Sequence, residues 1–248
     1  MKTKASAVIL MSLSLAFTNI ALSESHPSHW GYEGPEAPHN WGKLSPDYAL
    51  CDSGKNQSPV DIKGSIVSAK TPLKNAYHSG TQSIENNGHT IQINVKDYGH
   101  IELDGEAFDL RQFHFHAPSE NQINDKSYPF EAHFVHTNAQ NELLVLSVMF
   151  LEGNENTELN KAWANIPEKE GIVALNTGLD INKLLPNHLE YYRFSGSLTT
   201  PPCTEGVRWV VLKEPMSVSK AQIDAFRHAI HHNNNRPIQP LNGRVIIE

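Results

Sequence analysis

The chain has 248 residues, 39% of them hydrophobic, and includes four Trp, nine Phe and seven Tyr. This is enough apolar material for one sizeable core, which argues against intrinsic disorder. The formal net charge of −7 and the absence of any basic run argue against nucleic acid as a partner. The fourteen His residues direct attention to metal or proton chemistry.

The N-terminus has the pattern of a cleaved secretory signal peptide, residues 1–23. A basic start precedes an apolar run over residues 5–17, and the small residues Ala21 and Ser23 follow it. The alternative is an uncleaved anchor, but the run is shorter than the roughly 20 residues that a spanning helix needs. We therefore expect residues 24–248 to form a single exported domain with no stable membrane insertion.

Strands dominate the predicted elements of this domain. Residues 34–46 are rich in Gly, Pro and Trp without periodicity, so we expect irregular structure that wraps the surface. Short alternating or apolar runs then predict strands at residues 90–95, 99–103, 110–116, 130–136, 143–150 and 207–212.

Two helices are predicted. Ser219 and Gln222 make a capping box at the start of residues 219–230, whose apolar side chains share one face. A weaker helical pattern covers residues 157–166. The sequence therefore predicts a β-dominated domain with peripheral helices and long loops.

Residues 111–116 alternate polar and aromatic side chains. On a strand, Gln112, His114 and His116 share one face, so two imidazoles are aimed at one point. Surface His residues opposite a buried Phe face would explain this segment equally well. His133 decides the matter, because a hairpin lays the next predicted strand beside the first pair. Three neutral imidazoles leave the fourth tetrahedral position of Zn²⁺ open for water, which is typical of a catalytic zinc site.

Two polar residues precede candidate ligands at the same offset. Gln112 stands two positions before His114, and Glu131 two positions before His133, each on its ligand's strand face. Either is explicable as an ordinary polar strand residue. A ligating imidazole usually donates its other N–H to a fixed acceptor, so the shared offset favours a role in orienting the rings.

Ordered motifs from about Trp30 to Arg244 resemble the alpha-class carbonic anhydrases. The short loop before Glu120 and the signal peptide are similar to the bacterial branch. The matching motifs, in chain order, are WGY at residues 30–32, QSPVDI at 57–62, NGH at 87–89, QFHFH at 112–116, EAHFVH at 131–136, GSLTTPP at 196–202 and RPIQPLN at 236–242.

The resemblance implies a fold and a reaction. The fold is a mainly β domain, α+β by content, with a central twisted, mostly antiparallel sheet of about ten strands and zinc at the base of a conical cleft. The implied reaction is the zinc-dependent, reversible hydration of CO₂ to bicarbonate and a proton, in which zinc-bound hydroxide attacks CO₂ and a His carries the proton away. The implied partners are CO₂ and bicarbonate, with the chain a monomer or a homodimer.

The resemblance also assigns roles to residues. Thr199 would accept a hydrogen bond from zinc hydroxide and donate one to Glu120, and Thr200 would contact bicarbonate. The zinc ligands and the groups that orient them would be His114 with Gln112, His116 with the backbone carbonyl of Asn234, and His133 with Glu131. An apolar wall beside the nucleophile would comprise Val135, Val145, Leu198, Val207 and Trp209. From the pattern alone, Thr199 and Glu120 are ordinary loop residues and the apolar wall is sheet core.

His89 matches the proton shuttle of the family. Tyr32, Asn87 and Gln92 match positions that hold ordered water in the cleft. Without the resemblance, a His after Asn-Gly is a turn or strand-edge residue. The sequence departs from the common pattern at Ala117, Asn121 and Gln92, which concerns the water network and the rate more than the reaction.

The two Cys residues form either one bridge or two unrelated buried thiols on composition alone. Export to an oxidising compartment, together with the resemblance to bacterial relatives, implies a Cys51–Cys203 disulfide. The expected compartment is the periplasm, or the extracellular space if the source has no outer membrane.

Two other functions are weighed against this reading. An acatalytic, secreted zinc-binding module of the same fold would require the loss of a zinc-binding His, and none is lost. A zinc peptidase would require a His-Glu-x-x-His helix, which the sequence lacks. The remaining clusters are interpreted as polar residues at a helix C-terminus (His228, His231, His232) and as solvated residues near the mature N-terminus (His26, His29, His39).

Overall fold

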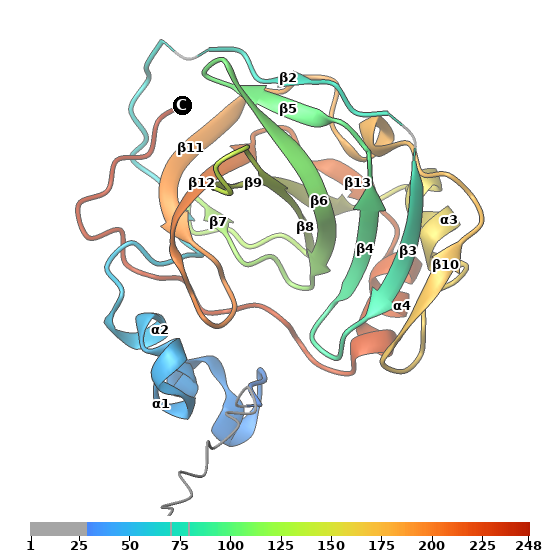
Figure 1. Ribbon diagram of the computed structural model, residues 1–248, viewed down its shortest axis with the longest axis horizontal. Coiled ribbons are helices and arrows are strands. Elements are labelled where there is room, and N and C mark those ends of the chain that lie inside the picture. Colours follow the sequence, from blue (N-terminus) through green and yellow to red (C-terminus); the bar gives the residue numbers. More distant parts are fainter. Residues whose placement is uncertain (1–28, 70, 79) are drawn as a thin grey trace, which may run out of the picture.

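The computed structural model describes residues 29–69, 71–78 and 80–248, so the predicted signal peptide and His26 lie outside the described residues. Most strands belong to one 11-stranded sheet, whose main path runs β10-β3-β4-β6-β8-β9-β12-β11 (Figure 1). Along that path the strands are β10 (Gly171–Leu175), β3 (Thr81–Asn86), β4 (Ile91–Lys96), β6 (Glu106–His116), β8 (Phe130–Thr137), β9 (Leu143–Glu152), β12 (Glu205–Leu212) and β11 (Tyr191–Ser197).

Five shorter strands complete the sheets. β13 pairs with β9, β2 pairs with β5 and β5 pairs with β6, while β1 and β7 form a separate two-stranded sheet. Pairing is parallel for β12–β9, β13–β9 and β1–β7 and antiparallel for every other pair, which confirms a mostly antiparallel sheet. The bounds are β1 (Asp61–Ile62), β2 (Lys74–Asn75), β5 (His100–Leu103), β7 (Gln122–Ile123) and β13 (Met216–Val218).

All six predicted strands are present, with ends that differ by a few residues. β6 differs most, because it begins at Glu106, in the hairpin that joins it to β5. Three longer strands of the sheet were not predicted, namely β3, β10 and β11. The reason is clearest in β10, an edge strand whose first four residues are exposed and therefore show no inside-outside alternation.

The segment 34–46 is more ordered than the irregular structure predicted for it. It contains single helical turns, of which α1 (Trp41–Leu44) is the longest, and α2 (Leu50–Ser53) follows. The fully buried Trp41 holds the segment, because its indole N–H is shared between the carbonyls of Gly31 and Glu36 at 2.8 and 2.9 Å. The turns at Gly34–Glu36, Pro38–Asn40 and Pro46–Tyr48 are 3₁₀, as is Ile181–Leu184 later in the chain.

The two predicted helices lie near the β3 and β10 edge of the sheet (Figure 1). α4 (Lys220–Ile230) has the predicted capping box, with Ser219 and Gln222 bonded reciprocally, and ends at His231 in the left-handed conformation. α3 (Thr157–Trp163) ends earlier than predicted, because the backbone N–H groups of Asn165 and Ile166 bond to carbonyls three residues back, as in a turn. Trp163 donates to the Gln222 carbonyl at 2.9 Å and so joins the two helices.

The aromatic face of β6 supplies the main core. Phe113 and Phe115 are fully buried, and Phe115 stacks on Phe130 with ring centroids 5.3 Å apart. Phe226 of α4 packs edge-on against Phe130. Because side chains alternate along a strand, this buried face fixes the opposite direction for the His residues between the Phe residues.

The predicted disulfide is confirmed. Cys51 in α2 is bonded to Cys203, at a sequence separation of 152. In the chain-entropy model, closing a loop of this size stabilises the fold by about 5 kcal/mol. Across the described ranges, no helix combines the length and the apolar character needed to cross a membrane.

A buried imidazole in β8 predicts acid sensitivity of the fold. His136 is fully buried against Tyr77, whose hydroxyl lies 2.6 Å from His136 Nε2, and burial lowers its pKa to about 3. Because the unfolded pKa is about 6.5, this stability is complete above pH 6.5 and declines as the pH falls toward 3, by up to roughly 5 kcal/mol. We expect the unfolding free energy of His136→Gln, measured by urea titration, to depend less on pH in this window. An unchanged pH dependence would contradict the assignment.

Candidate active site

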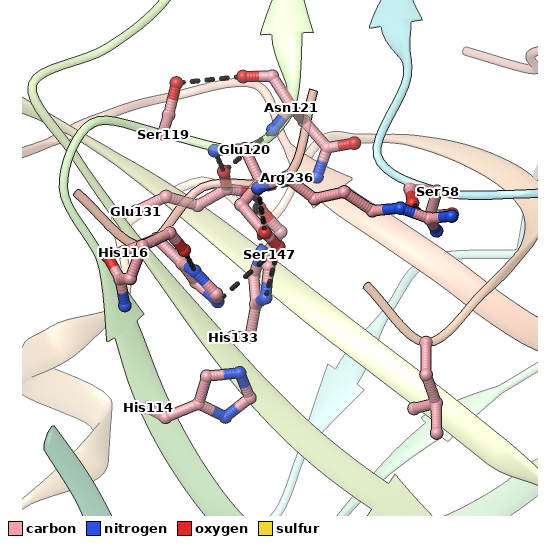
Figure 2. Close-up of polar contacts among 12 residues, drawn as sticks. Ser58, His114, His116, Ser119, Glu120, Asn121, Glu131, His133, Ser147 and Arg236 are labelled. Atoms are coloured by element: carbon pink, nitrogen blue, oxygen red, sulfur yellow. Dashed lines mark hydrogen bonds and ion pairs between the residues drawn. The ribbon is translucent and has the colours of Figure 1, made fainter. Parts of the chain in front are cut away.

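Three His side chains converge on the polar face of β6 and β8. The register places His114 opposite His133 and His116 opposite Glu131, which confirms the predicted hairpin arrangement. One ring nitrogen from each of His114, His116 and His133 lies within 4.8 Å of the others. Figure 2 shows the three rings facing one another. Within the described part of the chain, this is the one cluster of His, Cys, Asp or Glu side chains with metal-binding spacing.

Each of the three rings is fixed by an oxygen acceptor on its far nitrogen. The contacts are His114 Nδ1 to Gln112 Oε1 at 2.8 Å, His116 Nδ1 to the Asn234 carbonyl at 2.7 Å and His133 Nε2 to Glu131 Oε1 at 2.8 Å. Since an oxygen acceptor requires an N–H, the remaining nitrogens (Nε2, Nε2 and Nδ1) carry the lone pairs that face the common point.

The inward nitrogens have the character of metal ligands. Burial lowers the pKa of His114 well below its ordinary value and also lowers that of His116, so both rings are neutral near pH 7. His116 Nε2 is buried and has no hydrogen-bond partner in the described residues. Because a buried polar atom without a partner is costly, this nitrogen fits a metal ion at the centre of the cluster. The donor set of three neutral imidazoles fits Zn²⁺.

The groups around Glu131 keep its carboxylate ionised. Burial alone would raise its pKa, but His133 and hydrogen bonds from Ser147 and Asn121 lower the pKa to about 2. Oε1 accepts from Ser147 Oγ at 2.6 Å and from Asn121 Nδ2 at 2.8 Å, and Oε2 accepts from the backbone N–H of Glu120 and of Asn121 (Figure 2). An ionised Glu131 holds the His133 ring in one orientation.

Glu120, the second buried carboxyl group, faces the cluster. Its Oε2 lies 3.5 Å from His116 Nε2, and Oε1 accepts the backbone N–H of Arg236 at 2.9 Å. Burial raises the pKa of Glu120 to about 7, while His133, this backbone N–H and the Thr199 hydroxyl act to lower it. The structure therefore brings Thr199, itself buried, against Glu120, as the resemblance implied.

A small cavity opens from the cluster toward the surface. The cavity is about 130 Å³ and includes His89 and Thr200 together with two rings of the cluster, His114 and His116. The three positions expected to hold water also line it, namely Tyr32, Asn87 and Gln92. We call it the inner cavity.

The five residues of the implied apolar wall gather in one hydrophobic cluster. Val145, Val207 and Trp209 are almost completely buried, and Val135 and Leu198 pack against them half-buried. The Trp209 ring lies edge-on to His133, with centroids 4.9 Å apart. The cluster therefore reaches the site, although its buried members also belong to the sheet core.

Sequence reasoning missed three supporting residues. Ser147 donates a hydrogen bond to Glu131. The sequence contained a signal for this role, because Ser147 is a lone polar residue in the apolar run of β9. Asn121, noted only as a departure, donates to Glu131 and also accepts the backbone N–H of Val60. The fully buried Arg236 donates to backbone carbonyls of the N-terminal segment, including that of Cys51 at 2.8 Å.

Comparison with known proteins gives one consistent family. A family model described as eukaryotic-type carbonic anhydrase matches residues 36–248. A carbonic anhydrase of Pectobacterium carotovorum is 51% identical over 248 residues, covering 100% of both chains, and one of Klebsiella pneumoniae is 49% identical over 251 residues with the same coverage.

The solved structures agree in fold. The alpha-carbonic anhydrase from Thermovibrio ammonificans, determined with the inhibitor sulfanilamide, superposes with a TM-score of 0.88 at 48% identity, covering 90% of this chain and 100% of that one. The chain belongs to the eukaryotic-type, or alpha, carbonic anhydrase family.

Proposed function

We propose that this protein is an exported carbonic anhydrase that binds Zn²⁺ and catalyses the reversible hydration of CO₂ to bicarbonate and a proton. The observation that carries the proposal is the convergence of three imidazole nitrogens whose opposite nitrogens are each held by an oxygen. His114, His116 and His133 would hold the zinc. Zinc bound in this way lowers the pKa of a coordinated water from 15.7 to about 7, as in the known carbonic anhydrases, and so supplies a nucleophilic oxygen at neutral pH.

The residues around the cluster orient the reactants. The Thr199 hydroxyl donates a hydrogen bond to Glu120, so its oxygen can only accept a hydrogen bond from the attacking oxygen and thereby fixes where that oxygen's lone pair points. Val135 and Leu198 offer apolar surface to CO₂, which is small and nonpolar. Thr200 lines the inner cavity, where its hydroxyl can contact bicarbonate.

The alternative, an acatalytic zinc-binding module, would require the loss of a zinc-binding His, whereas the three candidate His residues have metal-binding spacing and Thr199 lies against Glu120. Stopped-flow CO₂ hydration by the purified protein, before and after removal of metal with a chelator, tests the proposal. We expect activity that disappears with the metal and returns with added Zn²⁺. Stoichiometric zinc without any hydration activity would favour the binding module.

The export proposal rests on the sequence pattern of residues 1–23. Cell fractionation and N-terminal sequencing of the mature protein test it. A mature chain that begins near Glu24 in a periplasmic or extracellular fraction would support it, whereas an intact Met1 in the cytoplasm would contradict it. Sedimentation of the same material distinguishes a monomer from a homodimer.

His89 is proposed to carry protons between the inner cavity and solvent. Its half-buried ring lines that cavity, and burial lowers its pKa, with smaller contributions in the same direction from His232 and His29. An imidazole that titrates near neutral pH is a better acceptor than bulk water.

His89→Ala is expected to lower kcat in dilute buffer by about tenfold or more, with kcat/KM almost unchanged, because attack on CO₂ precedes the proton step. Concentrated imidazole buffer is expected to restore much of the turnover. His100→Ala, a half-buried His on β5 outside the inner cavity, serves as the control. If kcat of the His89 variant matched that of the parent in dilute buffer, another group would carry the proton.

A further inference from the structure

A second cavity adjoins the inner cavity and shares one wall with it. This outer cavity is about 330 Å³, and four residues line both cavities, namely Trp30, Tyr32, Asn87 and His89. The His89 ring lies flat on Trp30, with centroids 3.8 Å apart and planes 8° apart. His89 therefore stands in the wall between the metal cluster and the surface.

The outer cavity contains the titratable groups that His89 meets on its solvent side. His29 lies with its ring centroid 6.4 Å from that of His89, and His232 enters from the segment after α4. The remaining titratable groups that line the cavity are the phenol of Tyr32 and the carboxylates of Glu33, Glu36 and Glu170.

His232 is held against the turn that carries His89. Its Nε2 lies 3.1 Å from the carbonyl oxygen of Gly88, and its Nδ1 lies 3.0 Å from the carbonyl oxygen of Asn233. The half-buried ring stacks on Tyr32, with centroids 5.4 Å apart. The His232 ring is thus held at both nitrogens and on one face.

The same segment ties this turn to the zinc site. Asn234, two residues after His232, donates its side-chain N–H to the His89 carbonyl at 3.1 Å, and its own carbonyl holds His116. The two peptide carbonyls of Gly88 and His89 are therefore both held by residues of this one segment. The turn that carries His89 is consequently held by a segment far along the chain.

We propose that His232 is a positioning residue for proton transfer, whose ring holds the turn at Gly88 and so places the neighbouring His89 ring between the two cavities. This inference rests on the proposed function. Burial lowers the pKa of His89 most, and the electrostatic effect of the His232 ring lowers it further.

The test compares His232→Ala, His232→Gln and a control, His228→Ala. His228 is an exposed imidazole in the last turn of α4 and does not line either cavity. In dilute buffer we expect kcat of His232→Ala to fall about three- to tenfold, the factor of one lost hydrogen bond, with kcat/KM and zinc content unchanged. His232→Gln keeps an N–H donor and is expected to recover part of kcat, and His228→Ala is expected to match the parent.

An NMR titration of the His89 ring provides a readout that does not depend on activity, with the signal assigned by its loss in His89→Ala. In both His232 variants the His89 pKa is expected to rise, because the His232 ring that lowers it has been removed. Unchanged kcat together with an unchanged His89 pKa would overturn the proposal, as would a parallel loss of kcat/KM, which would indicate damage to the zinc site.

The double variant His89→Ala/His232→Ala separates positioning from independent proton transfer. If His232 acts through His89, its removal has no further effect on kcat once His89 is gone. A further fall would show that His232 carries protons by itself and would overturn the proposal. Failure of the parent to hydrate CO₂ would contradict the proposed function instead, while the NMR arm would still test the coupling of the two rings.

Discussion

Replacing His116 with Ala is expected to abolish zinc binding at the cluster and, with it, CO₂ hydration. The variant leaves two imidazoles, which make a poor zinc site because each ligand accounts for a large share of the binding free energy. Dividing the free energy of a structural zinc site among its ligands gives a loss on the order of 100-fold or more in zinc affinity for one ligand. Metal analysis after dialysis and stopped-flow hydration measure the two effects on the same preparation.

Because His116 is fully buried, the Ala variant also removes packing, so a control for folding is needed. His116→Gln fills more of the volume and is expected to lose zinc as well, with a circular dichroism spectrum like that of the parent. His188→Ala removes an exposed imidazole far along the chain and is expected to keep one zinc and full activity. One tightly held zinc per chain and full activity in both His116 variants would refute the ligand assignment.

The cluster itself was predictable because its geometry is local. The Phe residues of β6 are buried, so the alternation of a strand places His114 and His116 together on the other face, and one hairpin adds His133. The offset of two residues likewise predicted Gln112 and Glu131 as acceptors, and the structure places both 2.8 Å from their rings.

Contacts between distant segments were not predictable from local pattern. The Asn234 carbonyl that holds His116 comes from a residue 118 positions away, and only the family resemblance pointed to it. Glu120 is set against the cluster by the Arg236 backbone at a separation of 116. Such pairs follow from the path of the C-terminal segment across the sheet, which no periodicity encodes.

The strands of the fold likewise divide into those that local sequence pattern predicts and those that it does not. A strand whose apolar side chains alternate with polar ones, such as β6, is predictable from its sequence pattern. The edge strand β10 exposes Ile172 and Val173 and has no alternation to detect. The histidine pair His89 and His232 was predictable in part. Each residue was noticed in the sequence, but only the fold shows that the segment after α4 meets the turn before β4.

Thr199→Ala is expected to keep zinc bound but to lower kcat/KM for CO₂ hydration on the order of 100-fold, the typical effect of removing one preorganised hydrogen-bonding group. In the parent, the Thr199 hydroxyl donates a hydrogen bond to Glu120, which leaves the hydroxyl oxygen to accept a hydrogen bond from the attacking oxygen. Without the hydroxyl, the attacking oxygen is free to rotate, and the buried Glu120 loses a partner. Because the substitution slows the attack step, kcat/KM should fall and imidazole buffer should not restore it. This is the reverse of the pattern expected for His89→Ala.

Two matched variants show whether the hydroxyl is responsible. Thr199→Ser keeps the hydroxyl and removes only a methyl group, so it is expected to retain most of kcat/KM. Thr204→Ala removes a hydroxyl from an exposed residue of the same loop, whose backbone carbonyl accepts from Leu198, and is expected to match the parent. Equal kcat/KM in Thr199→Ala and the parent would show that the Thr199 hydroxyl does not orient the reaction, whereas equal losses in the Ala and Ser variants would assign the effect to packing of the loop.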